Sequence, residues 1–509
     1  MKIVNIALCA ALLVCRMGAG AAIASDEASP SSSALQSERA ALATAIAESR
    51  KKDANRVALT ASMKTILSDP AFAGLSDNER HNAYFLYGAL LHDAHNWTDA
   101  QPYTRNASEM PQASAYDWDL RLANDFGVRD YADAVAVATK LARTWPQMLA
   151  HYTDGGMFLL AREARKISPD VEGDYLEALH QIGWQPKDEF STADSVLLAL
   201  MRIRLAHGDT PGAKAIAAQL RDPASILALH IDKRFDLVAK DDPQHFDVMS
   251  AYETSLAYFK AKSAAMPDKL KGVNTIAEQL IAMTRYDEGL ALTTSALDRL
   301  KADPKSFSDA DDNRNWTEDI RSRALFDLGR FDEGFAALSA GAAQKEGGQT
   351  NVSQAINLAD EYNLFDRPKD ALAAVAPVDP TQTSEYGRMA LEDARACAYF
   401  DLGDTAELSK SLDYMKAHRK DGMQPFLSTM LFIGNLDEAA EEVTAELRDP
   451  AERAEMLGYL QDYAPDPYPT KRSAAIHAAW IAVRNRPDVA AEIAKAGYVN
   501  TYPLHLSTY

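Results

Sequence analysis

Two stretches of the sequence, "RYDEGLALTTSAL" at residues 285–297 and "RFDEGFAALSAGA" at residues 330–342, repeat nearly the same residues 45 positions apart. In each, an arginine precedes an aromatic residue, two acidic residues follow, and a glycine stands three residues after the aromatic. Acidic residues in the first turn of a helix are favoured by its unpaired amides and its dipole. A small residue three positions further on lets two antiparallel helices approach to about 8–10 Å. The repeated stretch therefore predicts the junction between two packed helices.

Six further stretches have the same form, with an aromatic, apolar or small residue after the junction and a small or apolar residue three positions later. They are "HNWTDAQPY" from His95, "RDYADAVAV" from Arg129, "GDTPGAKAI" from Gly208, "DRPKDALAA" from Asp366, "GDTAELSKS" from Gly403 and "GNLDEAAEE" from Gly434. The later copies are separated by 45, 37, 37 and 31 residues. Glycine is favoured at such junctions because it adopts the left-handed conformation without a steric penalty. Eight copies predict a series of helix pairs.

This pattern resembles the tetratricopeptide repeat family, which has a small residue in its first helix, a Gly-x-aromatic turn and an alanine in its second helix. The resemblance covers roughly residues 82–450. It implies an all-α fold, a right-handed α-solenoid (superhelix) of stacked antiparallel helix pairs. Chance similarity between helix caps is the alternative, but cap chemistry alone does not require the aromatic and alanine offsets.

The chain of 509 residues divides into five predicted parts. They are a signal peptide (1–24), a disordered linker (25–36), N-terminal helices (37–81), a superhelix resembling tetratricopeptide repeats (82–460), and a C-terminal helical cap and tail (461–509). Within the superhelix, residues 150–265 do not hold the repeat register. We expect either degenerate repeats or a bend in that segment.

The N-terminus has the features of an export signal. Lys2 precedes the apolar run "IVNIALCAALLVC" at residues 3–15, and small residues lead to Ala24. This run is too short to span a bilayer of ~30 Å, so we expect cleavage after Ala24 and a periplasmic or secreted bacterial protein. Val14 before Cys15 and Leu8 before Cys9 disfavour a lipoprotein. Cleavage leaves Cys397 as the only thiol, so no internal disulfide can form.

The net charge and the absence of familiar motifs limit the possible functions. A formal net charge of −20 disfavours binding to nucleic acid or to an anionic membrane surface. The sequence has no GxSxG, HExxH, GxxxxGK[ST] or CxxC motif. His92 and His95 with Asp93, and the acidic loop "DADDNRN" at 309–315, are read as polar residues rather than as metal sites. We therefore expect no enzyme activity, no cofactor and no metal.

In tetratricopeptide repeat proteins the first helices form the concave surface that binds partners. If the first helices of this chain face the same way, the resemblance implies a binding groove with aromatic, polar and acidic side chains. Its candidate residues are Asn82, Phe85, His92, Tyr116, Asp119, Phe126, Asn274, Glu278, Trp316, Asp319, Arg323, Phe326, Asp360 and Asn363.

Because these residues include several carboxylates, we expect a basic or hydrogen-bonding partner. The predicted function is a non-enzymatic exported scaffold that binds an envelope protein or peptide. The alternative is a carbohydrate-handling protein, which binds a polysaccharide or hydrolyses a glycan with groove carboxylates. Solvent exposure of Trp316, Phe326, Phe126 and Phe85 would favour a groove, whereas burial would favour inter-repeat packing.

Overall fold

The computed structural model describes residues 31–241, 246–345 and 349–505. These residues are mainly helical, and their extended pairing is limited to isolated bridges such as Asp232 with Gly497. The all-α prediction is therefore confirmed. The chain divides into two compact units, residues 1–203 and 204–509. The predicted signal peptide and residues 25–30 of the predicted linker lie outside the described residues.

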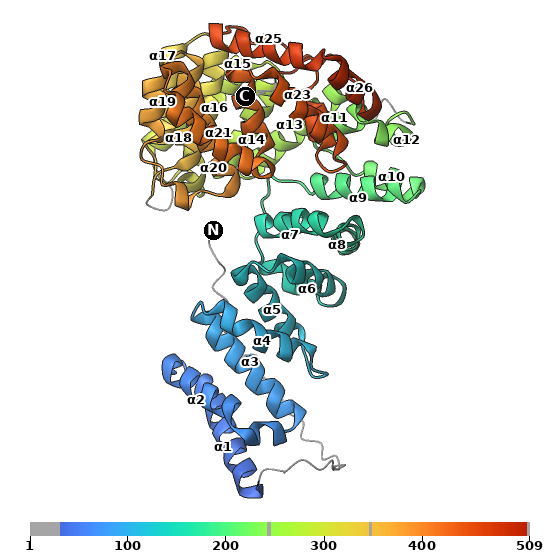
Figure 1. The fold of residues 1–509 in the computed structure, drawn as a ribbon, viewed down its shortest axis with the longest axis vertical. Helices are drawn as coiled ribbons and strands as arrows, with labels where there is room; N and C mark the ends of the chain where they lie inside the picture. The colour runs from blue at the N-terminus through green and yellow to red at the C-terminus, as the bar shows by residue number, and fades with distance from the viewer. Residues whose placement is uncertain (1–30, 242–245, 346–348, 506–509) are drawn as a thin grey trace. The chain divides into compact units, whose positions relative to one another are not determined.

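Helices of the first unit follow one another in an antiparallel series (Figure 1). They are α1 (Ser32–Ser49), α2 (Arg56–Ser68), η1 (Pro70–Gly74), α3 (Asp77–Asp93), α4 (Trp97–Glu109), α5 (Ala115–Val128), α6 (Tyr131–Thr144), η2 (Pro146–His151), α7 (Asp154–Ile167), α8 (Pro169–Gln181) and α9 (Asp194–Ala206), the last of which continues past the boundary of the unit.

The second unit contains the remaining helices. They are α10 (Thr210–Ala217), α11 (Pro223–Ile231), η3 (Lys233–Phe235), α12 (Asp236–Ala239), α13 (Val248–Ala265), α14 (Leu270–Ala282), α15 (Tyr286–Ala302), α16 (Ala310–Asp327), α17 (Phe331–Ala342), α18 (Val352–Leu364), α19 (Pro368–Val375), η4 (Pro380–Gln382), α20 (Glu385–Leu402), α21 (Thr405–Ala417), η5 (Arg419–Asp421), α22 (Met423–Phe432), α23 (Leu436–Arg448), α24 (Arg453–Tyr459), α25 (Lys471–Arg484) and α26 (Pro487–Ala496). None of the described helices combines the length and hydropathy needed to cross a bilayer.

Two predicted irregular segments are more ordered than expected. Helix α1 begins at Ser32, because the Ser31 side chain accepts a hydrogen bond from the amide of Ala34 and caps the helix. Residues 32–36 are therefore helical rather than part of a disordered linker. The described part of segment 150–265 forms helices α7 to α13 and contains a further left-handed turn at Gly183.

All eight predicted junctions are turns of one geometry. In each, a residue with positive φ follows the first helix, and the next amide donates a hydrogen bond to the carbonyl five residues earlier. The N···O distances are 2.8–3.0 Å, and the second helix begins at the next residue. The donor and acceptor pairs are Asn96 and Leu91, Asp130 and Asp125, Asp209 and Arg204, Arg285 and Leu280, Arg330 and Leu325, Arg367 and Tyr362, Asp404 and Tyr399, and Asn435 and Met430.

The small residues of the pattern lie where the two helices of a pair cross. An added Cβ at Gly334 would come within 2.8 Å of the Phe326 ring. Alanines at the equivalent position of the other pairs are fully buried, as Ala134 and Ala439 illustrate. A larger side chain at these positions would separate the helices. The predicted packing role of the repeated stretch is thus confirmed.

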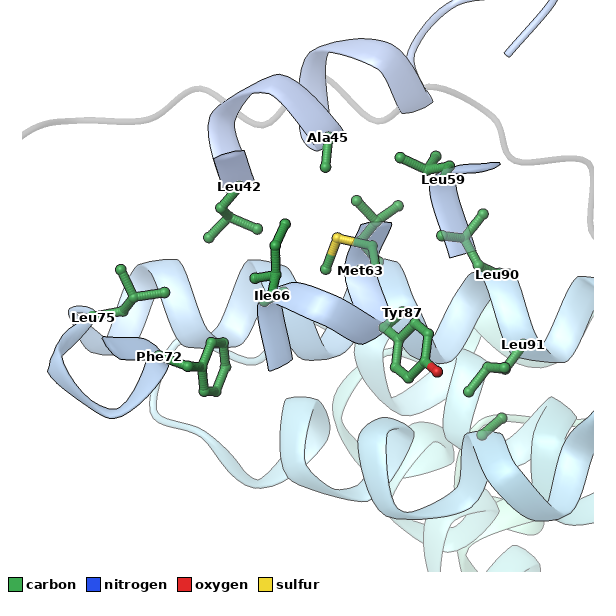
Figure 2. Packing of buried hydrophobic residues seen from close by; sticks show 13 residues of the cluster. Leu42, Ala45, Leu59, Met63, Ile66, Phe72, Leu75, Tyr87, Leu90 and Leu91 are labelled. Carbon is green, nitrogen blue, oxygen red and sulfur yellow. The ribbon is translucent and has the colours of Figure 1, made fainter. Parts of the chain in front are cut away.

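The first unit begins with a separate hydrophobic cluster formed by α1, α2, η1 and α3 (Figure 2). Leu42 of α1 and Met63 and Ile66 of α2 belong to one cluster with Tyr87 and Leu90 of α3. Complete burial of a side chain of this size contributes about 1.5–3 kcal/mol. This cluster holds the N-terminal helices to the repeat series.

Within the second unit the helices form a closed circuit. Helix α11 packs on α13, and the series then runs through α14, α16, α17, α18, α20, α22, α23 and α24, which packs back on α11. The predicted solenoid of consecutively packed helix pairs is confirmed, and in this unit its two ends also meet. The circuit closes because residues after α24 bind the beginning of the unit: the amide of Tyr498 donates to the carbonyl of Ile231 at 2.8 Å.

The left-handed turns generate a stability prediction. Gly434 has a φ of 76°, and a Cβ added there would meet no atom within 4 Å. We expect Gly434→Ala to lower the free energy of unfolding by about 1 kcal/mol through backbone strain alone. Thr284, a β-branched residue with a φ of 59°, is the matched site. Thr284→Gly is expected to raise stability by about 1 kcal/mol.

Urea unfolding followed by far-UV circular dichroism measures both changes. A Gly434→Ala variant as stable as the wild type would contradict the left-handed geometry.

Candidate functional site: the inner carboxylates of the second unit

First helices of the second unit bring five carboxyl groups near one another. Asp319 and Asp327 belong to α16, Asp360 and Glu361 to α18, and Asp393 to α20. We call these five residues the inner carboxylates. The Asn357 side chain of α18 donates to Asp319 at 2.9 Å and joins α16 to α18. Glu361 interacts electrostatically with Asp319 and Asp327, and Asp360 with Asp393.

Asp360 and Glu361 are the two inner carboxylates that lack a partner. Among the described residues, neither side chain makes a hydrogen bond or an ion pair. Both residues are half-buried, so part of each remains accessible to a ligand. Burial, followed by the negative charges of Asp319, Asp327 and Asp466, raises the pKa of Glu361 to about 8. Burial and the neighbouring Asp393 and Glu361 raise the pKa of Asp360 well above its ordinary range. A nearby cation would stabilise both carboxylates.

The remaining three inner carboxylates already have polar partners. Asp393 accepts hydrogen bonds from the Thr429 hydroxyl and from the buried Cys397 thiol, and burial raises its pKa to about 6. Asp327 lies 3.3 Å from His505, and burial raises its pKa to about 6 as well. Buried Asp319 interacts with Arg323 at 3.4 Å.

Positive charge near this group is scarce. Arg323 is the cation paired with an inner carboxylate on the first helices, and its guanidinium is shared with Glu278 at 3.4 Å. The Tyr386 hydroxyl, at the start of α20, donates to Gln424 at 2.8 Å, while the tyrosine remains 51 % exposed. The electrostatic neighbours of Tyr386 include Asp360 and Asp393. The group therefore combines excess negative charge with an accessible aromatic residue.

The predicted groove residues of the second unit separate into two classes. Trp316 is 39 % exposed, Glu278 is exposed, and Asp319, Arg323 and Asp360 belong to or pair with the inner carboxylates. The other three pack the helix stack, which corrects their predicted role. Asn274 donates to the carbonyl of Asn313, and Asn363 donates to the carbonyl of Ala394; both are buried. Phe326 packs among Phe331, Phe335 and Phe365 at the turn.

In the first unit, the predicted groove residues do not form an accessible, negatively charged group like the inner carboxylates. Tyr116 is 53 % exposed, whereas Asn82 and Phe85 are half-buried. Asp119 is buried and accepts a hydrogen bond from the Tyr152 hydroxyl at 2.9 Å.

Two other predicted residues of this unit also have packing roles. Phe126 packs against Tyr131 and Tyr152, and His92 is buried at the end of α3. Burial of His92 and Asp119 removes them from an open groove, and half-buried Phe126 is engaged by the two tyrosines. Among the residues that the structure describes, no three or more His, Cys, Asp or Glu side chains are placed so that they could hold one metal ion.

Sequence reasoning missed Glu361, Asp327, Asp393 and Tyr386. For Asp393 a signal was present. It stands twelve residues before Thr405, the first residue of α21, just as Asp319 stands twelve residues before Phe331, the first residue of α17. The repeat register therefore places both carboxylates at the same level of their first helices. For Glu361 no comparable local signal exists, because its pKa depends on burial and then on residues from α16 and from the loop after α24.

No protein-family model matches the chain, and no curated protein matches it. The structure of the APC/C hetero-tetramer Cut9–Hcn1 is 11 % identical, with coverage of 91 % of this chain and 96 % of that chain and a TM-score of 0.28. Yeast Tom70 is 11 % identical, with coverage of 90 % and 99 % and a TM-score of 0.30. Naa15/Naa10 bound to HypK-THB is 14 % identical, with coverage of 88 % and 68 % and a TM-score of 0.23.

The chain has a helical-repeat fold similar to tetratricopeptide repeats. This similarity rests on the eight turns and the small residues at the helix crossings. The ligand of the inner carboxylates has to be inferred from their own chemistry.

Asp125 in the first unit is a further unusual carboxyl group. Its carbonyl accepts the turn hydrogen bond, a position held by buried leucines in three other turns, Leu91, Leu280 and Leu325. Asp125 is 0 % exposed, and burial together with the neighbouring Asp133 raises its pKa to about 8. The folded chain therefore keeps this side chain protonated at neutral pH.

This raised pKa predicts a pH-dependent stability. The folded state binds the Asp125 proton with a pKa of about 8, against an ordinary value of 3.8. The free energy of unfolding therefore falls as the pH rises from about 4 to about 8, by at most ~1.4 kcal/mol per unit, and this contribution levels off above that range. Asp125→Asn mimics the protonated acid and should be increasingly more stable than the wild type up to pH 8.

Urea unfolding at several pH values measures this difference, with Asp99→Asn on the exposed surface of α4 as the control. A constant difference between pH 5 and pH 8 would contradict the buried, protonated state of Asp125.

Proposed function

We propose that the protein is a non-enzymatic, exported helical-repeat scaffold that binds a protein or peptide of the cell envelope. In this proposal, arginine or lysine side chains of the partner bind the inner carboxylates. The observation that carries it is the pair Asp360 and Glu361, which have raised pKa values and no hydrogen-bond or ion-pair partner among the described residues.

Binding of a basic segment is supported by the energetics of these carboxylates. A carboxylate deprived of part of its hydration, and surrounded by other carboxylates, is less stable than one in water. A guanidinium group from a partner would supply charge-assisted hydrogen bonds, which contribute more than neutral ones. The formal net charge of −20 would accelerate the approach of a basic partner at low ionic strength. The inner carboxylates thus favour a cationic ligand on both equilibrium and kinetic grounds.

Location in the cell envelope is the second part of the proposal. Lys2, the apolar run at residues 3–15 and the small residues before Ser25 support export followed by cleavage. A mature chain that starts at Ser25 would keep Cys397, which is buried and therefore protected from oxidation by the surrounding compartment. The fold would then rely on packing alone.

The charge of the inner carboxylates predicts how binding depends on salt and pH. The probe is a short peptide of alternating arginine and alanine with blocked ends, because arginine stays charged over the range tested. Its affinity should increase as the pH rises from 6 to 9, since Glu361 loses its proton with a pKa of about 8. Glu361→Gln should weaken binding about tenfold at pH 9, through loss of one charge-assisted contact, and should flatten the pH dependence.

Titration calorimetry at low and moderate salt measures these affinities, and affinity should fall as salt rises. Glu333→Gln is the matched control, because Glu333 is an exposed residue of α17 that pairs with Arg330 within the same turn. Equal affinities for wild type and Glu361→Gln, or no salt dependence, would contradict the proposed binding mode.

Export predicts a processed N-terminus. When the full chain is expressed in a Gram-negative bacterium, the protein released from the periplasm should begin at Ser25. Leu12→Arg interrupts the apolar run and should leave an unprocessed chain in the cytoplasm. N-terminal sequencing of fractionated protein checks both expectations. An unprocessed wild-type chain in the cytoplasm would contradict export.

A further inference from the structure

Two chain segments after α24 lie together at the turn end of α16. They are the loop 462–470, between α24 and α25, and the tail 498–505, after α26. The amide of Ala464 donates to the carbonyl of Leu504 at 2.8 Å, and the amide of Tyr502 donates to the carbonyl of Asp462 at 2.8 Å. We call these two paired segments the lid.

The lid contacts the first helices at three points. The Tyr468 ring lies against Gly329, where an added Cβ would be 3.1 Å from the ring. His505 lies 3.3 Å from Asp327, and its amide donates to the carbonyl of Ala282 at 2.8 Å. Leu504 is fully buried. The lid therefore covers the turn ends of α14 and α16, directly beside two inner carboxylates.

The loop of the lid also contains an acidic residue, Asp466, near the turn end of α16. Asp466 accepts a hydrogen bond from the amide of Tyr468 at 2.9 Å, and Tyr468 in turn lies on the turn after Asp327. The negative charge of Asp466 acts on both Asp327 and Glu361. Closure of the lid therefore brings a third carboxylate toward two others, which is unfavourable unless a positive charge lies among them.

The loop itself is held by few contacts of its own. Residues 465–469 are exposed, and three of them are prolines, which cannot donate backbone hydrogen bonds. By contrast, α25 is fixed to the ends of α18 and α20 by Arg472, which pairs with Asp366 and Asp401. The loop is therefore held by fewer interactions than α25.

We propose that the lid responds to ligand charge: a cationic partner group bound at the inner carboxylates is bridged by Asp466 and tightens lid closure. This inference rests on the proposed function and identifies Asp466 as a residue that couples binding to a conformational change. Contacts of Tyr468 and His505 stabilise the closed lid, whereas repulsion between Asp466 and the inner carboxylates destabilises it. A bound cation reduces this repulsion, so the fraction of molecules with a closed lid increases. An arginine side chain would satisfy carboxylates from both sides because its guanidinium carries five donors.

Hydrogen exchange of the full chain, measured with and without the blocked arginine–alanine peptide, tests the coupling. The amides of Asp462, Ala464 and Tyr502 report the lid, because each donates a backbone hydrogen bond inside it. The peptide should slow their exchange in the wild type. Asp466→Asn removes the like charge, so lid amides without peptide should exchange about two- to fivefold more slowly than in the wild type. The additional slowing by peptide should decrease in this variant.

Two further variants separate an effect on the lid from an effect of charge elsewhere or of general destabilisation. Asp332→Asn, in the exposed first turn of α17, is the charge control and should leave lid exchange unchanged. Tyr468→Ala removes the contact with Gly329 and should accelerate lid exchange while the exchange of α16 amides stays the same. Accelerated exchange throughout the second unit would instead show that Tyr468 supports the whole unit, which would overturn its role in a separate lid.

The outcomes distinguish the two proposals. Peptide binding with unchanged lid exchange would overturn the coupling and leave the proposed function intact. Absence of peptide binding under all conditions would overturn the proposed function and the coupling together. Identical lid exchange in wild type and Asp466→Asn without peptide would overturn the electrostatic opposition to closure.

Discussion

A single backbone arrangement recurs at eight helix pairs of this protein: one residue with positive φ, followed by an amide that donates to a carbonyl five residues earlier. This turn fixes where the second helix starts and therefore how far along the first helix each side chain lies. Residues at equal distances before the turn then occupy equal levels of successive first helices. Asp319 and Asp393 occupy the same level of α16 and α20 in this way, although 74 residues separate them in the sequence. The repeat register thus accounts for the positions of two of the inner carboxylates, Asp319 and Asp393.

Closure of the second unit places the loop after α24 near the inner carboxylates, which the repeat register alone does not do. The tail hydrogen-bonds to Ile231 and Ala282, so the beginning and the end of the unit are connected. The loop after α24 then lies beside Asp327 and Glu361, where its own Asp466 contributes negative charge. Desolvation and like charge act together at Glu361 and raise its pKa to about 8. A scaffold with this feature would bind cations more strongly as the pH rises.

The sequence predicts local structure here better than it predicts burial. The eight turns and the small residues at helix crossings follow from short-range chemistry, since caps, left-handed residues and steric contact each involve a few neighbouring residues. Asn274 and Asn363 show where this reasoning ends. Both are polar residues on first helices, yet both are buried because a neighbouring first helix offers each a backbone carbonyl. Such partners come from residues about 30 to 40 positions away and leave no mark in the local pattern.

Acidic residues outside the inner group illustrate the same limit. Asp309 in the loop "DADDNRN" accepts hydrogen bonds from the amides of Leu270 and Lys271 and so caps α14, a helix about 40 residues earlier. Asp125 occupies a position that is leucine in three other turns, which the alignment of turns could have revealed, but its raised pKa depends on burial first and then on the nearby Asp133. Long-range contacts, rather than local propensity, therefore decide the state of these carboxyl groups.

The most direct test of this account is residue-resolved hydrogen exchange at the eight turn amides, because the turn determines everything built upon it. The account predicts that the amides of Asp130, Arg285, Arg330 and Asn435, and of the equivalent residues in the other four turns, exchange far more slowly than unstructured peptides. Exchange of these amides at the rates of an unfolded chain, with the adjoining helices still protected, would contradict the shared turn geometry and the register of carboxylates that follows from it.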